Sequence, residues 1–542
     1  MWRRSDRAVN AEAFRRSQLD QYRRLAEVAN AVLQQCPRLP LLAVSLVNPR
    51  HVPAPQDLEL MATLDGNETA SNGEATVPVP SMVTIVRRLA GAALYALRET
   101  LRIASLRWRL RSAITRAKTA PADVVMKTWA FGSESLNGHG DFYFGALPAQ
   151  LRQRGVSCVL LYSDARNQDH GSHFARTALS KSSFRYCPEK ALIPLWGPLL
   201  TCARQFLTSM ALRRLAMRSD DPTFASVAGY LAAEVVRAYV TASSLYFYIG
   251  RAAVATWRPR AFVTLYEGQP WEKSAWQGAK AAGHDCALIG YQHTVLMPHS
   301  LSVLSPQDRS WGVSAPEYVL CLGETTMAML RPGHARHGTR LIRFGSYRWP
   351  ALDGAEWRPR PHARTLLVVP ETGIVSEAKL LFDFAVRAAR QIPDHRFIFR
   401  CHPVNPWGRL RHLLDDDGTG LPNVEISDKP SIAEDFARSS VVLYRGSSSV
   451  LYALLHGLKP VYLHDDAHHD VDPLFELKSW REPFSSVEEL AEVLRRYAGD
   501  DESAVAEEFA VADAYVRSYT SPVTDASVDE LVAAARLSDR RP

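Results

Sequence analysis

Closely spaced cysteines are absent from this sequence, although it contains seven cysteines among 542 residues. None forms a C-x-x-C pair, which argues against a structural zinc site. The odd number and the loose spacing are typical of reduced thiols in a cytoplasm and exclude a disulfide framework. The hydrophobic content of 46% is that of an ordinary globular protein, which excludes a disordered or fibrous chain.

Long apolar segments are also missing. The apolar stretches 191–203 and 238–250 each contain only 13 uncharged residues, whereas a membrane-spanning helix needs about 20. A longer uncharged run, 286–307, contains glycine, proline and histidine, which are typical of loops. Residues 1–24 are charged throughout and lack the apolar core of a secretory signal. We therefore expect a cytoplasmic protein.

Negative charge is scarce between Ser81 and Lys118. This segment carries nine cations and one anion, Glu99, so its net charge is +8. The whole chain is +7, which leaves −1 for the remainder. The apolar residues of the segment recur at helical spacing, which predicts a basic amphipathic helix on an anionic membrane surface. The alternative is a helix that packs on the protein and turns a solvated basic face outward.

The first part of the chain, 1–120, is predicted to be a helical accessory region. Residues 9–35 have the apolar spacing of an amphipathic helix, and 63–80 are polar and rich in turn formers, as in a linker. The basic segment contains one tyrosine, one tryptophan and no groove-reading motif, so we do not expect binding to nucleic acid.

From Ala122 onward, strand patterns alternate with helix patterns, which predicts parallel sheets. The strands are continuous apolar runs, as expected when both faces of a sheet are covered. The predicted strands are 122–131, 156–163, 261–268, 286–291, 317–323, 364–371, 395–402, 441–446 and 459–464. The predicted helices are 146–154, much of 190–256, 271–282, 375–391, 431–439, 448–456 and 486–497.

These patterns predict an α/β protein with two doubly wound Rossmann-like domains that face a cleft. We expect an N-terminal domain at 121–315, a C-terminal domain at 316–520 and a C-terminal helix at 521–542. Ligands of such sheets bind in the crevice at the carboxyl ends of the strands.

Two predicted strands end in residues suited to a phosphate. One strand ends at Arg400, Cys401 and His402, where Pro403 stops it. Another ends at Arg445 and Gly446 and is followed by a helix whose first turn contains Ser447, Ser448 and Ser449. A helix N-terminus attracts phosphate, and glycine allows close approach of the backbone. A run of serines alone indicates only a helix cap, but the two motifs together favour binding of a phosphate.

The His402–Pro403 pair and the serines before Gly457-Leu-Lys-Pro-Val resemble the C-terminal half of glycosyltransferases with the GT-B fold. The likeness is greatest to bacterial surface-polysaccharide enzymes of the sialyltransferase and Kdo-transferase groups, which have HP and SS motifs. The resemblance spans about 122–540. It implies that these motifs bind the nucleotide of a donor, a cytidine-monophosphate-activated acidic sugar such as Kdo or a nonulosonate.

Three further segments resemble surface carbohydrate biosynthesis proteins of the same broad group. They are Glu267-Gly-Gln-Pro-Trp271-Glu272, Gly290-Tyr-Gln-His293 and Asp141-Phe-Tyr-Phe-Gly145. The acidic pair before glycine that marks the sialyltransferases is replaced here by Gly140-Asp141-Phe142, so the resemblance does not identify the catalytic base.

Glycosyl transfer requires a carboxylate that deprotonates the acceptor or attacks the sugar. Glu267 is our first candidate, because it follows the apolar strand that ends at Tyr266. Glu267 or Glu272 could instead cap the helix that begins near Trp271. Asp141 and Glu134, in the glycine-rich loop after the first predicted strand, are the alternative bases.

Other polar residues follow predicted strands. Gln292 and His293 could bind the acceptor or a phosphate between the domains, and Glu371 could accept hydrogen bonds from the donor. Each of them could equally have a structural role. The cluster His464-Asp465-Asp466, His468-His469-Asp470 lacks the spacing of a metal site and is interpreted as a solvated loop.

The sequence therefore predicts a metal-independent glycosyltransferase without a cofactor, which uses a nucleotide sugar as substrate. Its catalytic residues would be Glu267 or Asp141 with His402, and its acceptor a surface polysaccharide or a lipid-linked glycan at the inner membrane. Whether configuration is inverted or retained stays open. The alternatives are a sugar-nucleotide 2-epimerase or glycerophosphotransferase on the same fold, and a non-catalytic scaffold of polysaccharide assembly.

Overall fold

The computed structural model describes residues 81–130, 141–164, 184–298, 300–304, 315–348, 358–370, 375–402, 405–465, 468 and 470–536. The predicted features of 1–80 and most of the glycine-rich loop lie outside these residues. So do three predicted site residues, Glu134, Glu371 and Pro403.

The first domain is built on a seven-stranded sheet in which every pair of neighbouring strands is parallel. Its strand order is β3-β2-β1-β4-β5-β6-β7, so the chain reverses direction across the sheet between β1 and β4. The strands are β1 Val124–Ala130, β2 Cys158–Asp164, β3 Arg185–Pro188, β4 Ala261–Leu265, β5 Ala287–Tyr291, β6 Tyr318–Cys321 and β7 Arg340–Arg343.

Both faces of this sheet are covered, which explains why its strands are continuous apolar runs. One face packs on α10 (Tyr246–Trp257) and α11 (Pro270–Lys280), and the other on α5 (Leu147–Gln153) and α21 (Asp525–Ala534). Helices α10 and α11 approach each other closely through Gly250 and Gly278, where a Cβ atom would lie 1.9 and 2.0 Å from backbone oxygens of the other helix.

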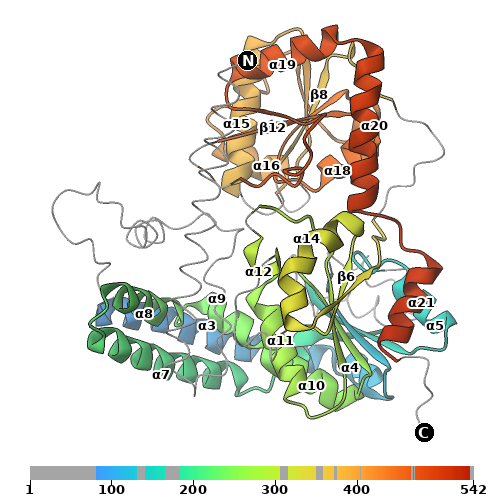
Figure 1. Cartoon of the computed structure of the whole chain (residues 1–542). Helices are drawn as coiled ribbons and strands as arrows, with labels where there is room; N and C mark the ends of the chain where they lie inside the picture. Colours follow the sequence, from blue (N-terminus) through green and yellow to red (C-terminus); the bar gives the residue numbers. More distant parts are fainter. Residues whose placement is uncertain are drawn as a thin grey trace.

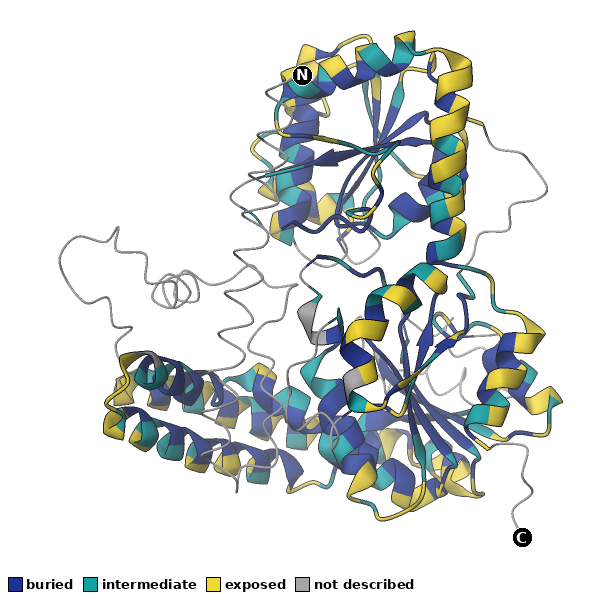
Figure 2. Cartoon of the chain, in the orientation of Figure 1, coloured by how far each residue is buried: buried dark blue, intermediate teal, exposed yellow. Residues whose placement is uncertain are grey.

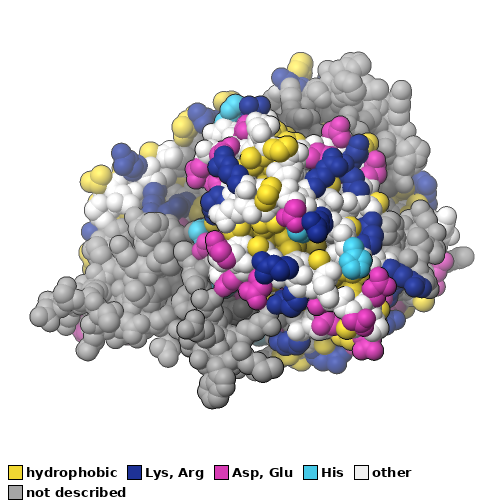
Figure 3. Space-filling view, turned by 90° about the horizontal axis from the view of Figure 1, so that it is seen from above, with side chains coloured by type: hydrophobic (Ala, Val, Ile, Leu, Met, Phe, Trp, Pro, Cys, Tyr) yellow, Lys and Arg dark blue, Asp and Glu magenta, His cyan; other side chains and the backbone are white. Residues whose placement is uncertain are grey.

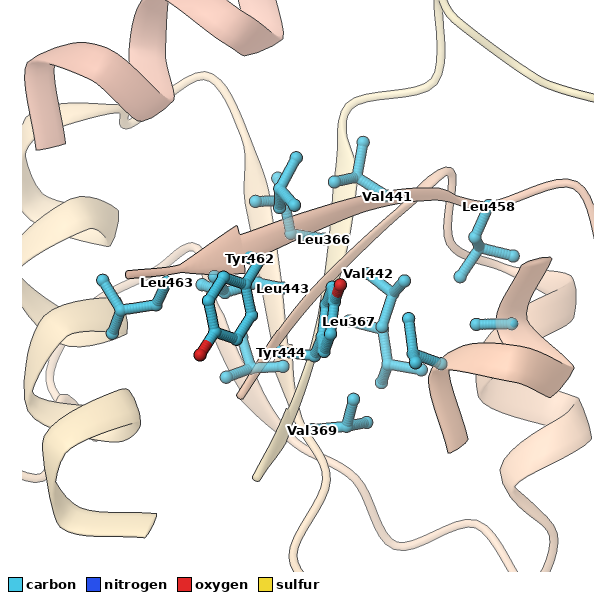
Figure 4. Packing of buried hydrophobic residues seen from close by; sticks show 14 of the residues in the cluster. Leu366, Leu367, Val369, Val441, Val442, Leu443, Tyr444, Leu458, Tyr462 and Leu463 are labelled. Atoms are coloured by element: carbon cyan, nitrogen blue, oxygen red, sulfur yellow. The ribbon is translucent and has the colours of Figure 1, made fainter. Parts of the chain in front are cut away.

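The second domain contains a six-stranded parallel sheet of order β10-β9-β8-β11-β12-β13. Leucine and valine side chains of β8 and β11, with Tyr444 and Tyr462, fill its core (Figure 4). The strands are β8 Thr365–Pro370, β9 Arg396–Phe399, β10 Val424–Ile426, β11 Val441–Arg445, β12 Lys459–Leu463 and β13 Glu482–Phe484. The helices are α15 Val375–Gln391, α16 Trp407–Leu410, α17 Ile432–Ala437, α18 Ser449–Leu455 and α19 Val487–Gly499.

The chain returns to the first domain through α20 (Glu502–Tyr519), which runs along the second domain and ends beside α14 (Glu324–His334) (Figure 1). Ser518 of α20 accepts a hydrogen bond from Thr325 at 2.9 Å. Helix α21 then packs on the first domain, where Arg154 binds Asp525 and Asp529. The two domains are therefore joined by two segments of chain.

A helical arm projects sideways from the first domain (Figure 1). It consists of α3 (Met82–Arg109), α7 (Gly197–Arg218), α8 (Pro222–Glu234) and α9 (Ala238–Ser244), and α4 (Arg111–Lys118) connects α3 to the sheet domain. Apolar side chains of α3, α7 and α8 form the interior of the arm, and exposed residues cover its outside (Figure 2). None of the described helices is long and apolar enough to cross a membrane.

The prediction of an α/β protein with two parallel sheets is confirmed, and each predicted strand coincides with an observed strand. The predicted boundary at 315–316 needs correction. The segment predicted as a strand at 317–323 forms β6, which pairs with β5, and β7 follows it in the same sheet. The first sheet thus extends to Arg343. The short strands β3, β7, β10 and β13 were not predicted.

Candidate functional site

Two candidate residues from neighbouring strands form a pair. Glu267 follows β4 and His293 follows β5, and parallel pairing of these strands brings their carboxyl ends together. Glu267 Oε1 lies 3.1 Å from His293 Nε2. The Glu267 side chain is 17% exposed and that of His293 is 4% exposed. The carboxylate is thus the more accessible member of a close pair.

The backbone of Glu267 is fixed by Glu272, in the first turn of α11. The Glu272 carboxylate accepts hydrogen bonds from the backbone N–H groups of Glu267, Gly268 and Gln269, at 2.9 to 3.1 Å. Burial raises the pKa of Glu272 well above its usual value, and the charge of Glu267 adds to the rise. Of the two acids predicted as caps, Glu272 therefore caps the helix, and Glu267 is directed to His293.

Asp141 holds a tight turn near the pair. Its carboxylate accepts hydrogen bonds from the Thr128 hydroxyl and from the backbone N–H groups of Tyr143 and Phe144. Burial raises the pKa of Asp141, and these hydrogen bonds oppose the rise. The turn brings the Tyr143 ring to 4.5 Å from the His293 ring. Asp141 thus positions a neighbour of the pair, and its oxygens are already engaged.

Arg348 and Gln292 fix the backbone around His293. Arg348 donates a hydrogen bond to the His293 carbonyl oxygen at 2.5 Å. The Gln292 side chain donates to the Thr294 carbonyl oxygen and accepts from the Leu322 N–H group. Because both ends of the Gln292 amide are bound to backbone, its observed role is to hold the loop after β5.

A buried lysine lies near these acids. Lys127 of β1 is enclosed by aromatic rings, with Nζ 3.3 Å from the ring centroid of Trp129 and 4.4 Å from that of Trp271. Its nearest carboxylate, Glu189, is 3.8 Å away, and Nζ has no hydrogen-bond acceptor among the described residues. Burial lowers the pKa of Lys127 to about 8, although Glu189, Glu272, Glu267 and Asp141 oppose the change.

The second domain meets the first beside the pair. Val295 and Leu322, from loops of the first domain, belong to the hydrophobic core of the second. Tyr519 of α20 accepts a hydrogen bond from the Leu296 N–H group at 2.6 Å. Burial raises the pKa of Tyr291, and the Tyr452 phenol of α18 contributes to the rise. Helix α18 lies at the end of the second domain that faces the first domain (Figure 1).

The predicted donor motif lies at the carboxyl end of β11 and leads into α18. Gly446 has a positive φ of 71° and turns the chain from β11 toward α18. The Ser447 hydroxyl accepts a hydrogen bond from the Ser449 N–H group at 3.3 Å. Ser448 is the N-cap residue, but its side chain makes no capping hydrogen bond. The Ser447 hydroxyl thus holds the turn, and the Ser448 hydroxyl has no such structural task.

The two arginines of the motif are bound inside the domain. The Arg445 side chain is fully buried and forms an ion pair with Glu377 of α15 at 2.5 Å. Arg400 binds Asp435 at 2.9 Å and the Lys429 carbonyl oxygen at 2.6 Å. Removal of one partner from a buried ion pair is costly, so phosphate contact by either arginine would require an exchange of partners.

His402 follows β9 and is half-buried. Burial lowers the pKa of His402, which favours a neutral ring at neutral pH. A neutral imidazole can still donate one hydrogen bond to a phosphate. Among the described residues, no cluster of histidine, cysteine and acidic side chains could hold a metal ion. In the loop predicted to be solvated, His468 lies 3.0 Å from Asp465.

Sequence reasoning missed Lys127, Tyr143 and Arg348. Lys127 is a single charge within an apolar strand, a signal that could have identified it. Tyr143 lies in the same segment as the candidate Asp141, but the local sequence does not show that its ring contacts His293. Arg348 follows β7, which was not predicted.

No family model matches the chain, and no curated protein matches its sequence. Several solved structures resemble it with TM-scores below 0.5. A glycotransferase of kitacinnamycin shares 14% identity over 76% of this chain and 99% of its own, with a TM-score of 0.43. A UDP-GlcNAc 2-epimerase from Neisseria meningitidis, bound to UDP-GlcNAc, shares 9% identity over 77% of this chain and 100% of its own, with a TM-score of 0.43. The glycosyltransferase SnogD from Streptomyces nogalater shares 15% identity over 76% of this chain and 99% of its own, with a TM-score of 0.38.

Proposed function

We propose that the protein is a glycosyltransferase of the GT-B type, in which the first domain binds the acceptor and the second binds a nucleotide sugar. The observation that carries the proposal is the Glu267–His293 pair, with 3.1 Å between Oε1 and Nε2, at the carboxyl ends of β4 and β5. Polar groups at this edge of a parallel sheet are where ligands of such folds bind. In this proposal the second substrate, held by the other domain, reaches the pair at the domain junction.

The donor is held by the second domain in this proposal. The Gly446 turn, the Ser448 and Ser449 hydroxyls and His402 all follow strand ends of one sheet. Backbone N–H groups and hydroxyls are suitable ligands for a phosphate. Arg400 and Arg445 are engaged in ion pairs and would act by their charge. The resemblance of the HP and SS motifs favours a cytidine-monophosphate-activated acidic sugar, such as Kdo or a nonulosonate.

The reaction proceeds as one displacement. Glu267 takes the proton of the acceptor hydroxyl, and the acceptor oxygen forms a bond to the anomeric carbon of the donor sugar. The bond between that carbon and the phosphate oxygen breaks, and the nucleotide leaves with the electron pair. His293 holds the carboxylate in place, and the groups around Gly446 stabilise the negative charge on the leaving phosphate. A single displacement inverts the configuration of the sugar.

The acceptor in this proposal is a growing surface polysaccharide or a lipid-linked glycan. The enzyme would work in the cytoplasm at the inner membrane, where such acceptors are built. No cofactor is needed, because the leaving nucleotide and the protein side chains supply the chemistry.

The test is a panel of nucleotide sugars, with cytidine-monophosphate and uridine-diphosphate donors, incubated with and without a glycan acceptor. Acceptor-dependent release of cytidine monophosphate, with inversion seen by NMR, is the expected result. Conversion of a uridine-diphosphate sugar without acceptor would replace the proposal by an epimerase. If no nucleotide stabilises the protein in thermal melts, a non-catalytic scaffold is the better interpretation, since ligand at 100 times its Kd should add about 2.7 kcal/mol.

A further inference from the structure

Helix α3 has two apolar faces, and only one of them is buried in the arm. The inner face contains Ile85, Ala92, Ala96 and Ile103, which are fully buried. The opposite face carries larger apolar side chains that are 48% to 77% exposed. We call this set the outer stripe; it consists of Val83, Val86, Leu94, Leu97, Leu101 and Trp108.

The outer stripe is continuous along the helix. Its members lie three or four residues apart once the exposed Ala90 and Ala104 are included, which is the spacing of one helical face. A surface helix of a globular protein normally presents polar side chains opposite its buried face. The predicted alternative for this segment, a solvated basic outer face, therefore does not describe α3.

Charge on the exposed part of α3 has one sign. At 100° per residue, Arg87, Arg98 and Arg109 flank the same edge of the outer stripe, and all three are exposed. The single acidic residue of the helix, Glu99, is buried and binds Lys190 at 2.6 Å. Arginines on the protein side are used within the arm, since Arg88 binds Glu234. The outside of α3 thus combines apolar side chains with the positive charge of exposed arginines.

One face of the second domain differs from the outside of α3. Seen from above, the described surface of the second domain shows cationic and anionic side chains interspersed (Figure 3). The arm that carries α3 projects sideways from the first domain (Figure 1). The face of the second domain seen in this view therefore lacks the charge of one sign that the outside of α3 carries.

We propose that the outer stripe of α3 lies in the surface of an anionic lipid bilayer. An amphipathic helix binds such a surface when apolar side chains enter the interface and arginines contact anionic headgroups. Trp108, near the end of the helix, is of the residue type enriched at that interface. A second copy of the chain is a poorer occupant, because a symmetric contact would bring the two rows of arginines together. The inference extends the proposed function by naming the surface that holds the enzyme at its acceptor.

The test measures binding of the full-length protein to vesicles without donor or acceptor, so that its result is independent of the enzymatic assignment. Vesicles of phosphatidylcholine with phosphatidylglycerol are compared with phosphatidylcholine alone. The variant is Leu97→Glu with Leu101→Glu, and the control is Val511→Glu, an equally exposed apolar residue on α20. Equal melting temperatures of the three proteins verify that all are folded.

The wild type and the Val511→Glu control should bind anionic vesicles, and binding should weaken as salt rises. The vesicle affinity of the stripe variant should be lower than that of the wild type by about tenfold or more, because each leucine loses an apolar contact with the bilayer. Arg87→Gln with Arg98→Gln should weaken binding to anionic vesicles only. Equal binding of the stripe variant and wild type, or no binding of the wild type at low salt, would overturn the proposal. So would a stripe variant that changes only the oligomeric state, since a second copy would then cover the stripe.

Discussion

Glu267 and His293 come from the ends of two adjacent parallel strands and lie 3.1 Å apart, with Glu267 the more exposed. The backbone of each is fixed separately, that of Glu267 by the buried Glu272 and that of His293 by Arg348. Such support limits the positions that the two side chains can adopt, which a catalytic pair requires. The pair is therefore the feature of the first domain on which the proposed chemistry depends.

His293 is expected to position the Glu267 carboxylate. Replacement of His293 by Phe keeps a ring beside Tyr143 but removes the ring nitrogen next to the Glu267 carboxylate, so kcat should fall about tenfold to a hundredfold. KM for the donor should stay unchanged, and the pH dependence of kcat should shift. Steady-state kinetics against pH measure all three. A fall in kcat larger than that of a Glu267 variant would identify His293 itself as the base.

Ser448 is expected to bind the donor phosphate through its hydroxyl. Ser448→Ala should reduce nucleotide affinity by about 1.5–3 kcal/mol, the value of a hydrogen bond to a charged group. Titration calorimetry with cytidine monophosphate measures the loss. The melting temperature should hardly change, because the side chain makes no cap. Ser503→Ala, at the opposite end of the second domain in α20, is the control, and equal affinity of the two variants would exclude Ser448 from the site.

The buried pair of Arg445 and Glu377 should determine the stability of the second domain. Glu377→Gln leaves a buried guanidinium without its counter-charge, so the free energy of unfolding should fall by about 3–5 kcal/mol. Denaturant titration measures it. Asp394→Asn breaks the exposed pair with Arg364 and should cost no more than about 1 kcal/mol. A similar loss in the free energy of unfolding for both variants would contradict the assigned burial of Arg445.

Acid should destabilise the first domain through His334. This ring is buried between Tyr266 and the Val303 carbonyl oxygen, at 3.3 and 3.0 Å, and burial lowers its pKa from 6.5 to about 4. The folded state thus binds fewer protons than the unfolded state between these values. The contribution is complete above pH 6.5 and is lost toward pH 4, with a maximum of about 3 kcal/mol.

Unfolding at several pH values measures this effect. His334→Gln should flatten the dependence between pH 6.5 and 4, whereas His284→Gln, at an exposed histidine of the first domain, should leave it as in the wild type. The same slope in all three proteins would show that another group titrates.

The sequence predicted the positions of the strands better than it predicted which strands pair with each other. Apolar runs identify β1, β4 and β11 locally, because each is covered on both faces. Nothing local shows that β6 joins the first sheet, since this depends on pairing with β5. The strand β13 is three residues long and contains Pro483, so it carries almost no strand signal.

In the candidate site, too, the sequence predicts single residues but not the contacts between them. Glu267 and His293 could be proposed separately from their places after strands, but their contact depends on sheet order. The engagement of Arg400 and Arg445 could not be predicted, because Asp435 and Glu377 are on helices far along the chain. Short-range patterns thus identify residues at strand ends, and tertiary packing decides which of them remain available to a ligand.

The most direct test of the central claim is the rate of sugar transfer by Glu267→Gln, which keeps the shape of the side chain and removes the base. The rate should fall by about a hundredfold to ten-thousandfold, while nucleotide affinity and melting temperature stay those of the wild type. Glu324→Gln, an exposed acid at the start of α14, should transfer sugar normally. A Glu267→Gln protein that transfers sugar at the wild-type rate, with an inactive Asp141→Asn protein of normal stability, would contradict the account and move the base to the turn after β1.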